Sequence, residues 1–290
     1  MKKKNNSTVW LVLILLVGLS LILYPSVSDY WNSFHQTRAI VNYAEAVAGI
    51  GGERYGDMWR SAADYNARLA RTGILWELTD EQRAAYEAEL NVTGTGIMGY
   101  IEIPKINCSL PIYHSTSEAV LQVAVGHLEG SSLPVGGEST HCLLSGHRGL
   151  PSARLFTDID QLEEGDSFVL RTLDETLSYQ VDRIRIVLPY ELDDLRIEPG
   201  EDLCTLITCT PYGINSHRLL VRGHRVENAP EARQIRVTGD AFLIDPLVVA
   251  PLAALPMLLA LLIALYAGGA RKRARRKTLS RMEVRTDEKP

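Results

Sequence analysis

The chain contains a cysteine at a position suited to nucleophilic chemistry. Cys209 ends the apolar run 203–209, and a turn containing Pro211 and Gly213 follows it directly. A side chain at the end of a strand, beside a loop, is held rigidly yet can be reached by a substrate. A thiolate is a strong nucleophile, and a nearby cation makes it easier to form. Cys209 is therefore a candidate nucleophile, although an inert buried cysteine fits the same pattern.

His147 and Arg218 have types and positions that complement this cysteine. His147 ends the apolar run that begins at His141, and Arg218 opens the expected strand that follows Cys209. A cysteine enzyme that cleaves an amide needs a proton donor for the leaving amine and a base for the incoming nucleophile, and imidazole serves as both near neutral pH. A guanidinium supplies a permanent cation. Taken singly, His147 also fits a structural histidine in a turn, and Arg218 fits a surface ion pair.

The elements that must position these residues belong to a β domain. From residue 97 onward, alternating or apolar runs are separated by turn sequences rich in glycine and proline. This punctuation predicts a barrel or sandwich of about 130 residues. The expected strands include 99–103, 141–147, 167–172, 178–187, 203–209 and 218–226.

Residues 34–94 have the composition of helices, because Ala, Glu, Arg and Leu dominate and proline is absent. Thr79 and Gln82 match the two ends of a capping box, which predicts a helix running from there to about Asn91.

Two uncharged apolar segments near the chain ends predict membrane-spanning helices. Residues 8–24 follow a lysine cluster, and residues 246–267 precede a basic cluster at 271–277. As helices they are about 25 Å and about 33 Å long, which suffices to cross a bilayer. Basic clusters favour the cytoplasmic side, so we expect a two-pass protein of the cell membrane with both termini cytoplasmic and residues 25–245 outside. A cleaved signal peptide is the alternative for the first segment, and it leaves the middle outside as well.

Charge and cysteine spacing exclude some other classes of function. The formal net charge is −5, but the basic residues are concentrated at the two ends, so the middle is strongly acidic and a poor candidate for binding nucleic acid. The C-terminal basic run fits a topology signal with contacts to lipid. The cysteine spacing lacks the form of a metal site, and we expect no metal and no cofactor. Cys108, Cys142 and Cys204 are expected to be buried thiols.

These segments together resemble the sortases and, within them, the class C sortases that assemble pili. TLITC at 205–209 matches the sortase signature that ends in the nucleophile, and His147 and Arg218 occupy the positions of the family's other two active-site residues. Further matching blocks, in order, cover most of residues 97–226. They are GYIEIPKI (99–106), LPIYH (110–114), GHLEGSSLPVGGEST (126–140), SGHRGLPSARLFTD (145–158) and TCTPYGINSHRLLVRG (208–223).

The resemblance implies a mainly β fold, with an eight-stranded sortase-type barrel, N-terminal helices and a transmembrane helix at each end. It implies that Cys209 attacks the Thr–Gly amide of an LPxTG-like sorting signal and that a lysine of a neighbouring pilin resolves the thioacyl enzyme. His147 then protonates the departing amine and deprotonates the attacking one. Arg218 bonds the substrate backbone or the oxyanion.

One departure from the class C pattern concerns the lid. Many class C sortases cover the groove with a segment that carries Asp-Pro-aromatic, and no Asp-Pro occurs between residues 25 and 96. Asp57, Trp59 and Trp76 are the candidates for a lid. Anchoring of a helix to the barrel is the alternative role for the tryptophans.

The expected order of segments follows from these observations. It is a basic cytoplasmic tail (1–7), a transmembrane helix or signal anchor (8–24), a helical lid-like region (25–96), the catalytic barrel (97–226), a linker (227–245), a transmembrane helix (246–267) and a basic cytoplasmic tail (268–290).

Other functions stay open from the sequence. The same chemistry could attach surface proteins to peptidoglycan, or water could resolve the acyl enzyme and make the protein a hydrolase. A non-catalytic, membrane-tethered binding domain is the alternative from another class. The sequence does not define the oligomeric state.

Overall fold

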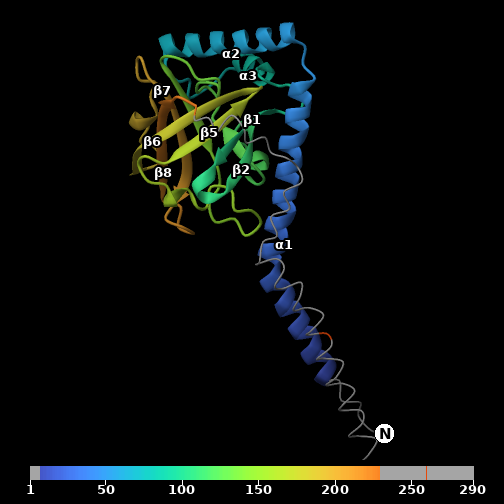
Figure 1. Ribbon diagram of the computed structural model, residues 1–290. Coiled ribbons are helices and arrows are strands. Elements are labelled where there is room, and N and C mark those ends of the chain that lie inside the picture. The colour runs from blue at the N-terminus through green and yellow to red at the C-terminus, as the bar shows by residue number, and fades with distance from the viewer. Residues whose placement is uncertain (1–6, 229–258, 260–290) are drawn as a thin grey trace, which may run out of the picture. The chain divides into compact units, whose positions relative to one another are not determined.

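A closed β-barrel forms the centre of the protein. The computed structural model describes residues 7–228 and residue 259. Within that part of the chain, eight strands close in the order β1-β2-β3-β4-β7-β8-β6-β5 (Figure 1). The strands are β1 (Ile97–Ile103), β2 (Cys108–His114), β3 (Val125–His127), β4 (Thr140–Ser145), β5 (Ser167–Thr172), β6 (Glu175–Val187), β7 (Asp202–Thr210) and β8 (His217–Val226). The eight-stranded barrel expected from the sequence is confirmed.

Two of the strand pairs are parallel, namely β2 with β3 and β4 with β7, and the others are antiparallel. The pairing of β4 with β7 brings together two segments that are about 60 residues apart in the chain. This pairing matters for function, because the first segment leads into His147 and the second ends beside Cys209.

The apolar side chains gather on two faces of the barrel wall. Phe168, Tyr179, Leu206 and Val221 belong to the main core and are fully buried. A second, smaller group, which we call the outer cluster, consists of Leu143, Val187, Leu195 and Leu220. Neighbours on a strand point to opposite faces, so β8 contributes Val221 to the main core and Leu220 to the outer cluster.

Helix α1 (Ser7–Ala48) joins the expected first span to the barrel without a break, because the helix continues past Pro25. Its part from Ile14 to Ala48 is long and apolar enough to cross a membrane, and its early apolar side chains are exposed, as for Leu21 at 70% and Ile22 at 75%. Its last turns dock on the barrel, where the Tyr43 hydroxyl donates to the Met98 carbonyl at 2.9 Å.

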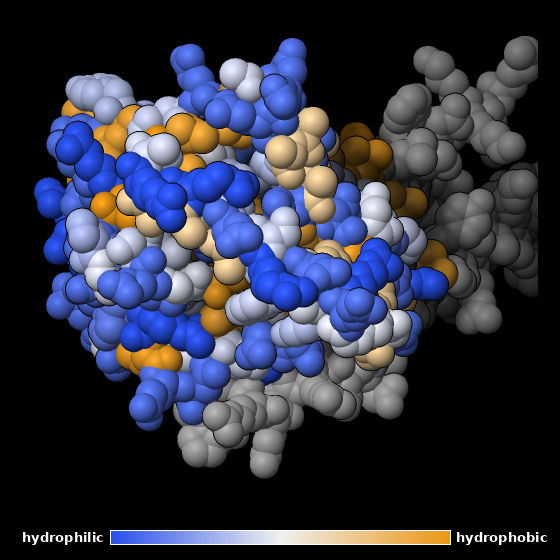
Figure 2. Space-filling model, turned by 90° about the horizontal axis from the view of Figure 1, so that it is seen from above, coloured by the Kyte–Doolittle hydropathy of each residue, from blue (hydrophilic) through white to orange (hydrophobic). Residues whose placement is uncertain are grey.

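Two further helices cover one end of the barrel, α2 (Gly52–Thr72) and α3 (Asp80–Ala88) (Figure 1). The capping box is confirmed, because the Thr79 hydroxyl accepts from the Gln82 amide at 3.2 Å and the Gln82 side chain accepts from the Thr79 amide at 2.9 Å. Helix α3 ends at Ala88, somewhat before Asn91. The face seen from above is predominantly hydrophilic (Figure 2).

The remaining elements are one-turn helices in the connections. They are η1 (Pro104–Ile106), α4 (Glu118–Leu121), η2 (Ile159–Gln161) and η3 (Asp193–Leu195).

One strand boundary expected from the sequence needs correction, and two strands were not identified from it. Strand β4 ends at Ser145, so His147 lies in the loop after the strand rather than inside it. The strands β2 and β3 lack clear alternation, and β3 has only three residues, which is why periodicity did not identify them. The expected second span at 246–267 lies outside the described residues, apart from residue 259, as do residues 1–6 and 229–245.

Candidate active site

Cys209 and Arg218 are direct partners across the antiparallel pair β7–β8. Directly opposed residues of such a pair share one face of the sheet, so the thiol and the guanidinium lie on the same side. Ile207 precedes Cys209 by two residues and packs against the outer cluster, which places Cys209 on the outer face of the barrel wall. Both Cys209 and Arg218 are partly exposed.

The guanidinium of Arg218 is held by backbone carbonyls. Its Nη1 donates to the carbonyl of His217 at 3.1 Å and to that of Asn215 at 3.3 Å. Among the described residues, no carboxylate lies within ion-pair distance of Arg218. The cation is therefore positioned by its own loop and keeps donors for an oxygen atom of a substrate.

The segment that carries His147 is fastened to strand β7. Ser145 lies opposite Ile207 in the parallel pair, and the Gly146 amide continues that pairing by donating to the Ile207 carbonyl at 3.0 Å. The buried hydroxyl of Thr208 donates to the Gly146 carbonyl at 2.7 Å. The loop that carries His147 is therefore bonded to the strand that carries Cys209.

The turn after His147 also contacts the turn after Cys209. The ring of Tyr212 packs on Gly149, where a Cβ atom would lie 2.9 Å from the ring. Gly149 has a φ of +76°, a conformation that favours glycine. The Arg148 guanidinium reaches the Thr210 hydroxyl at 3.4 Å and pairs with Asp160. The two loops thus support each other and set the spacing of the candidate histidine and cysteine.

Glu118 of helix α4 faces the imidazole of His147. The Nε2 atom of His147 is buried, and the described residues offer it no hydrogen-bond partner. The Oε2 atom of Glu118 lies 3.5 Å from it, which is an ion-pair contact rather than a hydrogen bond. A hydrogen bond from Gln122 and then the charge of His147 lower the pKa of the Glu118 carboxyl. Glu118 was not predicted from the sequence, since the contact joins helix α4 to a loop distant in the chain.

The other cysteines lack the setting of a nucleophile. The four cysteines are free thiols; Cys142 and Cys204 are buried and Cys108 is partly buried. Burial raises the pKa of the Cys108 thiol to about 12 and that of Cys204 well above its ordinary value. Burial also acts to raise the pKa of the Cys142 thiol, but hydrogen bonds from Cys204 and His127 outweigh it and lower this pKa to about 6. The Cys142 thiol is nevertheless buried. Cys209 is therefore the partly exposed cysteine that has a guanidinium group as its direct strand partner.

The lid candidates Asp57 and Trp59 lie on helix α2, and Trp76 lies in the segment between α2 and α3. Asp57 forms an exposed ion pair with Arg60 within α2 at 2.6 Å. Trp59 packs against the main core and stacks on Tyr55. Trp76 is 45% exposed. The structure thus gives Trp59 the contacts of a helix anchor and leaves Trp76 at the surface.

A residue that the sequence did not single out, Ile74, packs against the outer cluster. The Leu75 amide that follows it donates to the Gly130 carbonyl at 3.0 Å, which fixes this segment on the barrel. Ile74 therefore lies on the face of the barrel wall that continues into Cys209 through Ile207.

Comparison with known proteins shows which family has this arrangement. The family model described as "Sortase domain" matches residues 101–226. The crystal structure of sortase C1 from Streptococcus agalactiae shares 54% identity with a TM-score of 0.65, covering 66% of this chain and 100% of that chain. Sortase C from Streptococcus pneumoniae shares 44% identity with a TM-score of 0.59, covering 67% and 99%. Sortase D from Bacillus subtilis (strain 168) is 31% identical over 131 residues, which span 44% of this chain and 63% of that protein.

The chain belongs to the sortase family, whose members are cysteine transpeptidases. Its structural neighbours include class C sortases.

Proposed function

We propose that this protein is a membrane-anchored transpeptidase that cleaves an LPxTG-like sorting signal between Thr and Gly and transfers the acyl part to a lysine amine of a pilin. The observation that carries the proposal is the direct pairing of Cys209 with Arg218, with the His147 loop bonded to the same strand. This arrangement assembles a nucleophile, a cation and an acid–base group at one edge of the barrel wall.

The first half of the reaction uses all three residues. The Cys209 sulfur attacks the threonine carbonyl carbon, and the carbonyl oxygen takes up the negative charge beside Arg218. The tetrahedral intermediate collapses when the carbon–nitrogen bond breaks, and His147 gives a proton to the departing glycine amine. The products are a thioester on Cys209 and a peptide that begins with glycine.

The second half repeats these steps with another amine. A lysine amine attacks the thioester carbonyl, His147 removes the proton from the attacking nitrogen, and the Cys209 sulfur leaves as thiolate. An isopeptide bond forms and the enzyme is restored. Resolution by water instead of an amine gives hydrolysis, so the outcome depends on which nucleophile reaches the thioester.

The pilin acceptor is supported by the similarity to class C sortases at 43–54% identity. A solved structure of sortase C from Clostridium perfringens, 44% identical, is described as being with the C-terminal cell wall sorting motif. Attachment to peptidoglycan is the second candidate, because the matches also include sortase A from Bacillus anthracis at 29% identity.

The proposed location follows from α1 and the sequence. The apolar part of α1 continues without a break into the part that docks on the barrel. This continuity supports a catalytic domain held close to the outer face of the cell membrane. A second span at 246–267 with both termini in the cytoplasm completes the proposed topology. An epitope tag fused after residue 290 tests this topology. Digestion of the tag by a protease added outside intact cells contradicts it.

Reconstitution with two acceptors tests the proposed function. Full-length protein in detergent receives a sorting-signal peptide together with either a lysine-containing pilin domain or a wall-peptide amine. We expect an isopeptide product with the pilin lysine and none with the Cys209→Ala variant. Transfer to the wall amine alone favours the second candidate, and the absence of cleavage by the unmodified protein contradicts both.

A further inference from the structure

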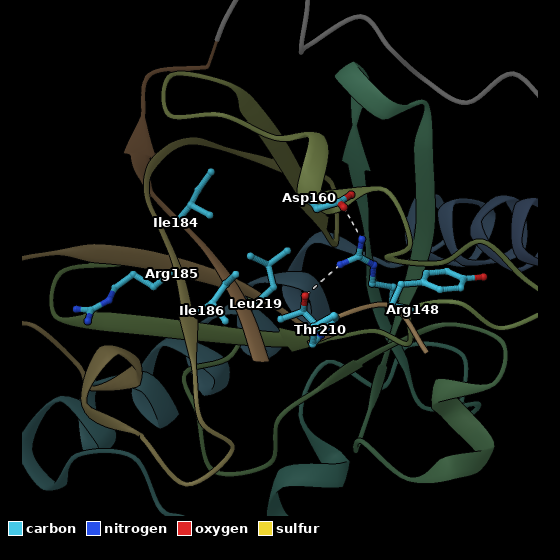
Figure 3. A pocket seen from close by; sticks show the side chains of 9 residues that line it. Arg148, Asp160, Ile184, Arg185, Ile186, Thr210 and Leu219 are labelled. Carbon is cyan, nitrogen blue, oxygen red and sulfur yellow. Dashed lines mark hydrogen bonds and ion pairs between the residues drawn. The ribbon is translucent and has the colours of Figure 1, made fainter. Parts of the chain in front are cut away.

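A pocket lies at the mouth of the barrel beside the candidate active site. Its volume is about 610 Å³, within the range of ligand sites. Figure 3 shows its lining side chains, which come from the His147 loop, η2, β6, the end of β7 and the start of β8. They are Arg148, Asp160, Ile184, Arg185, Ile186, Thr210, Pro211, Tyr212 and Leu219.

The pocket lies on the opposite side of the barrel wall from the nucleophile. Thr210 and Leu219 line it, and each directly follows one of the paired residues Cys209 and Arg218. Successive side chains of a strand point to opposite faces. Leu219 belongs to the main core, whereas Cys209 shares its face with the outer cluster. The pocket is therefore separated from the thiol only by the ends of two strands.

The lining has the chemistry of a site for an apolar side chain. Ile186 is 64% exposed and Tyr212 is 62% exposed, although both are large apolar side chains. The polar part of the pocket lining is an ion pair in which the charge of Asp160 offsets that of Arg148. Arg148 also bonds Thr210, as Figure 3 shows. The guanidinium of Arg185 points away from the other lining side chains (Figure 3). This lining does not select an anion.

Exposed apolar groups extend beyond the pocket around the same strand ends. Ile214 in the turn after β7 is 72% exposed, and Tyr190 after β6 is 76% exposed. Large apolar side chains gathered at one end of a soluble domain mark a contact site for another chain. The surface around these strand ends therefore suits a polypeptide rather than a small ligand.

A transpeptidase must hold two polypeptides at a single thioester. The acyl group of the first is bonded to Cys209 and lies on the outer face with Arg218. The second must bring its amine to the same carbon from another side. The barrel mouth meets this requirement, since it adjoins the end of β7 without sharing the outer face.

We propose that this barrel-mouth pocket binds an apolar side chain of the polypeptide that supplies the acceptor amine. The inference rests on the proposed transfer to a lysine and adds the place where the acceptor is recognised. An aliphatic side chain a few residues from the lysine enters the pocket and packs on the paired side chains of Ile186 and Leu219. The peptide backbone then lies along the turn at Tyr212, and the lysine reaches the thioester around the end of β7.

A set of lysine peptides tests the pocket directly. Each peptide carries one Leu in an otherwise Gly-Ser sequence, and the Leu is moved from four residues before the lysine to four residues after it. Full-length protein in detergent is first acylated with a sorting-signal peptide, and transfer is followed by mass spectrometry. We expect at least one Leu position to raise kcat/KM by about five-fold or more over the peptide without Leu, since burying a leucine side chain is clearly favourable.

The variant Ile186→Asp separates pocket binding from chemistry. It is expected to abolish the preference for Leu while acylation by the sorting signal and transfer to Nα-acetyl-lysine amide stay within about two-fold. The matched control is Val123→Asp, because Val123 is an exposed apolar residue at 44% that does not line the pocket. This control should keep the Leu preference.

Three results overturn the inference. The first is an unmodified protein that shows no Leu preference at any position, and the second is an Ile186→Asp variant that keeps the preference. The third is an equal loss of acylation and transfer in Ile186→Asp, which assigns the pocket to the first substrate or to folding. A protein that fails to transfer even to Nα-acetyl-lysine amide contradicts the proposed function itself, which distinguishes the two failures.

Discussion

Cys209 and Arg218 face each other across β7 and β8, one residue before the end of the first strand and one residue after the start of the second. Their relative position is set by backbone pairing rather than by flexible side-chain contacts. A cation fixed in this way can stabilise charge that develops on the substrate oxygen without reorganising during the reaction. The same β7 strand holds the histidine loop through Thr208, so one strand organises all three groups.

The hydroxyl of Thr208 should be required to position His147. Thr208→Val removes the donor to the buried Gly146 carbonyl, which costs about 1–3 kcal/mol of stability. We expect acylation of Cys209 to slow on the order of ten-fold, because the histidine loop loses its attachment. Thr208→Ser keeps the hydroxyl and is the matched control. Unfolding curves and single-turnover acylation rates of the two variants check this expectation, and equal rates contradict it.

Glu118 should stabilise the protonated form of His147 when that residue acts as an acid. Because Glu118 is 71% exposed, the effect is small, and Glu118→Gln should slow acylation by only about two- to three-fold. Glu163→Gln, which changes a carboxylate that is 83% exposed beside Lys105, is the control. An acylation rate of Glu118→Gln equal to that of the unmodified protein rules out the role.

Removal of Ile74 should expose the face on which Cys209 lies. Ile74→Ala removes roughly 1 kcal/mol of apolar packing on the outer cluster. With this free energy lost, we expect a methanethiosulfonate reagent to label Cys209 about five-fold faster. Trp76→Ala changes a side chain that is already 45% exposed and should leave labelling nearly unchanged. A larger acceleration in Trp76→Ala supports the sequence-based lid hypothesis in place of this account.

His141 should make the fold less stable in acid. Burial lowers the pKa of His141 to about 4, and the bond to the Arg196 carbonyl only partly offsets this. The unfolded chain has the higher pKa of about 6.5 and therefore binds more protons between the two values. The stability contributed by neutral His141 is complete above pH about 6.5 and is lost as the pH falls towards 4, by roughly 3 kcal/mol in total.

Denaturant unfolding of the full chain between pH 7 and pH 4 measures this dependence. His141→Gln can still donate to the Arg196 carbonyl and accept from Thr205 but does not titrate, so its stability should vary less with pH. Parallel pH dependences of the two proteins contradict the prediction.

The barrel and the candidate triad were predictable because their signals are local. Apolar runs that end in Cys209 and His147, with turns directly after them, resemble a known family over an ordered series of blocks. The capping box at Thr79 involves neighbouring residues and was recognised for the same reason. Strand pairing then brought Cys209 and Arg218 together as expected.

The features that the sequence did not reveal depend on tertiary contacts. Glu118 meets His147 from helix α4, and Ile74 reaches the outer cluster from the segment between α2 and α3. Neither residue has a type or spacing that marks it, since one is an ordinary exposed acid and the other an ordinary aliphatic side chain. The barrel-mouth pocket likewise arises from five separate segments.

Trapping the acyl enzyme tests the central claim most directly. Full-length protein is mixed with a sorting-signal peptide, quenched in acid within one turnover, digested and analysed by mass spectrometry. The account predicts a hydroxylamine-sensitive thioester on Cys209 that carries the substrate up to its threonine, with no adduct in Cys209→Ala. An adduct on Cys108, Cys142 or Cys204, or cleavage that persists in Cys209→Ala, contradicts the account.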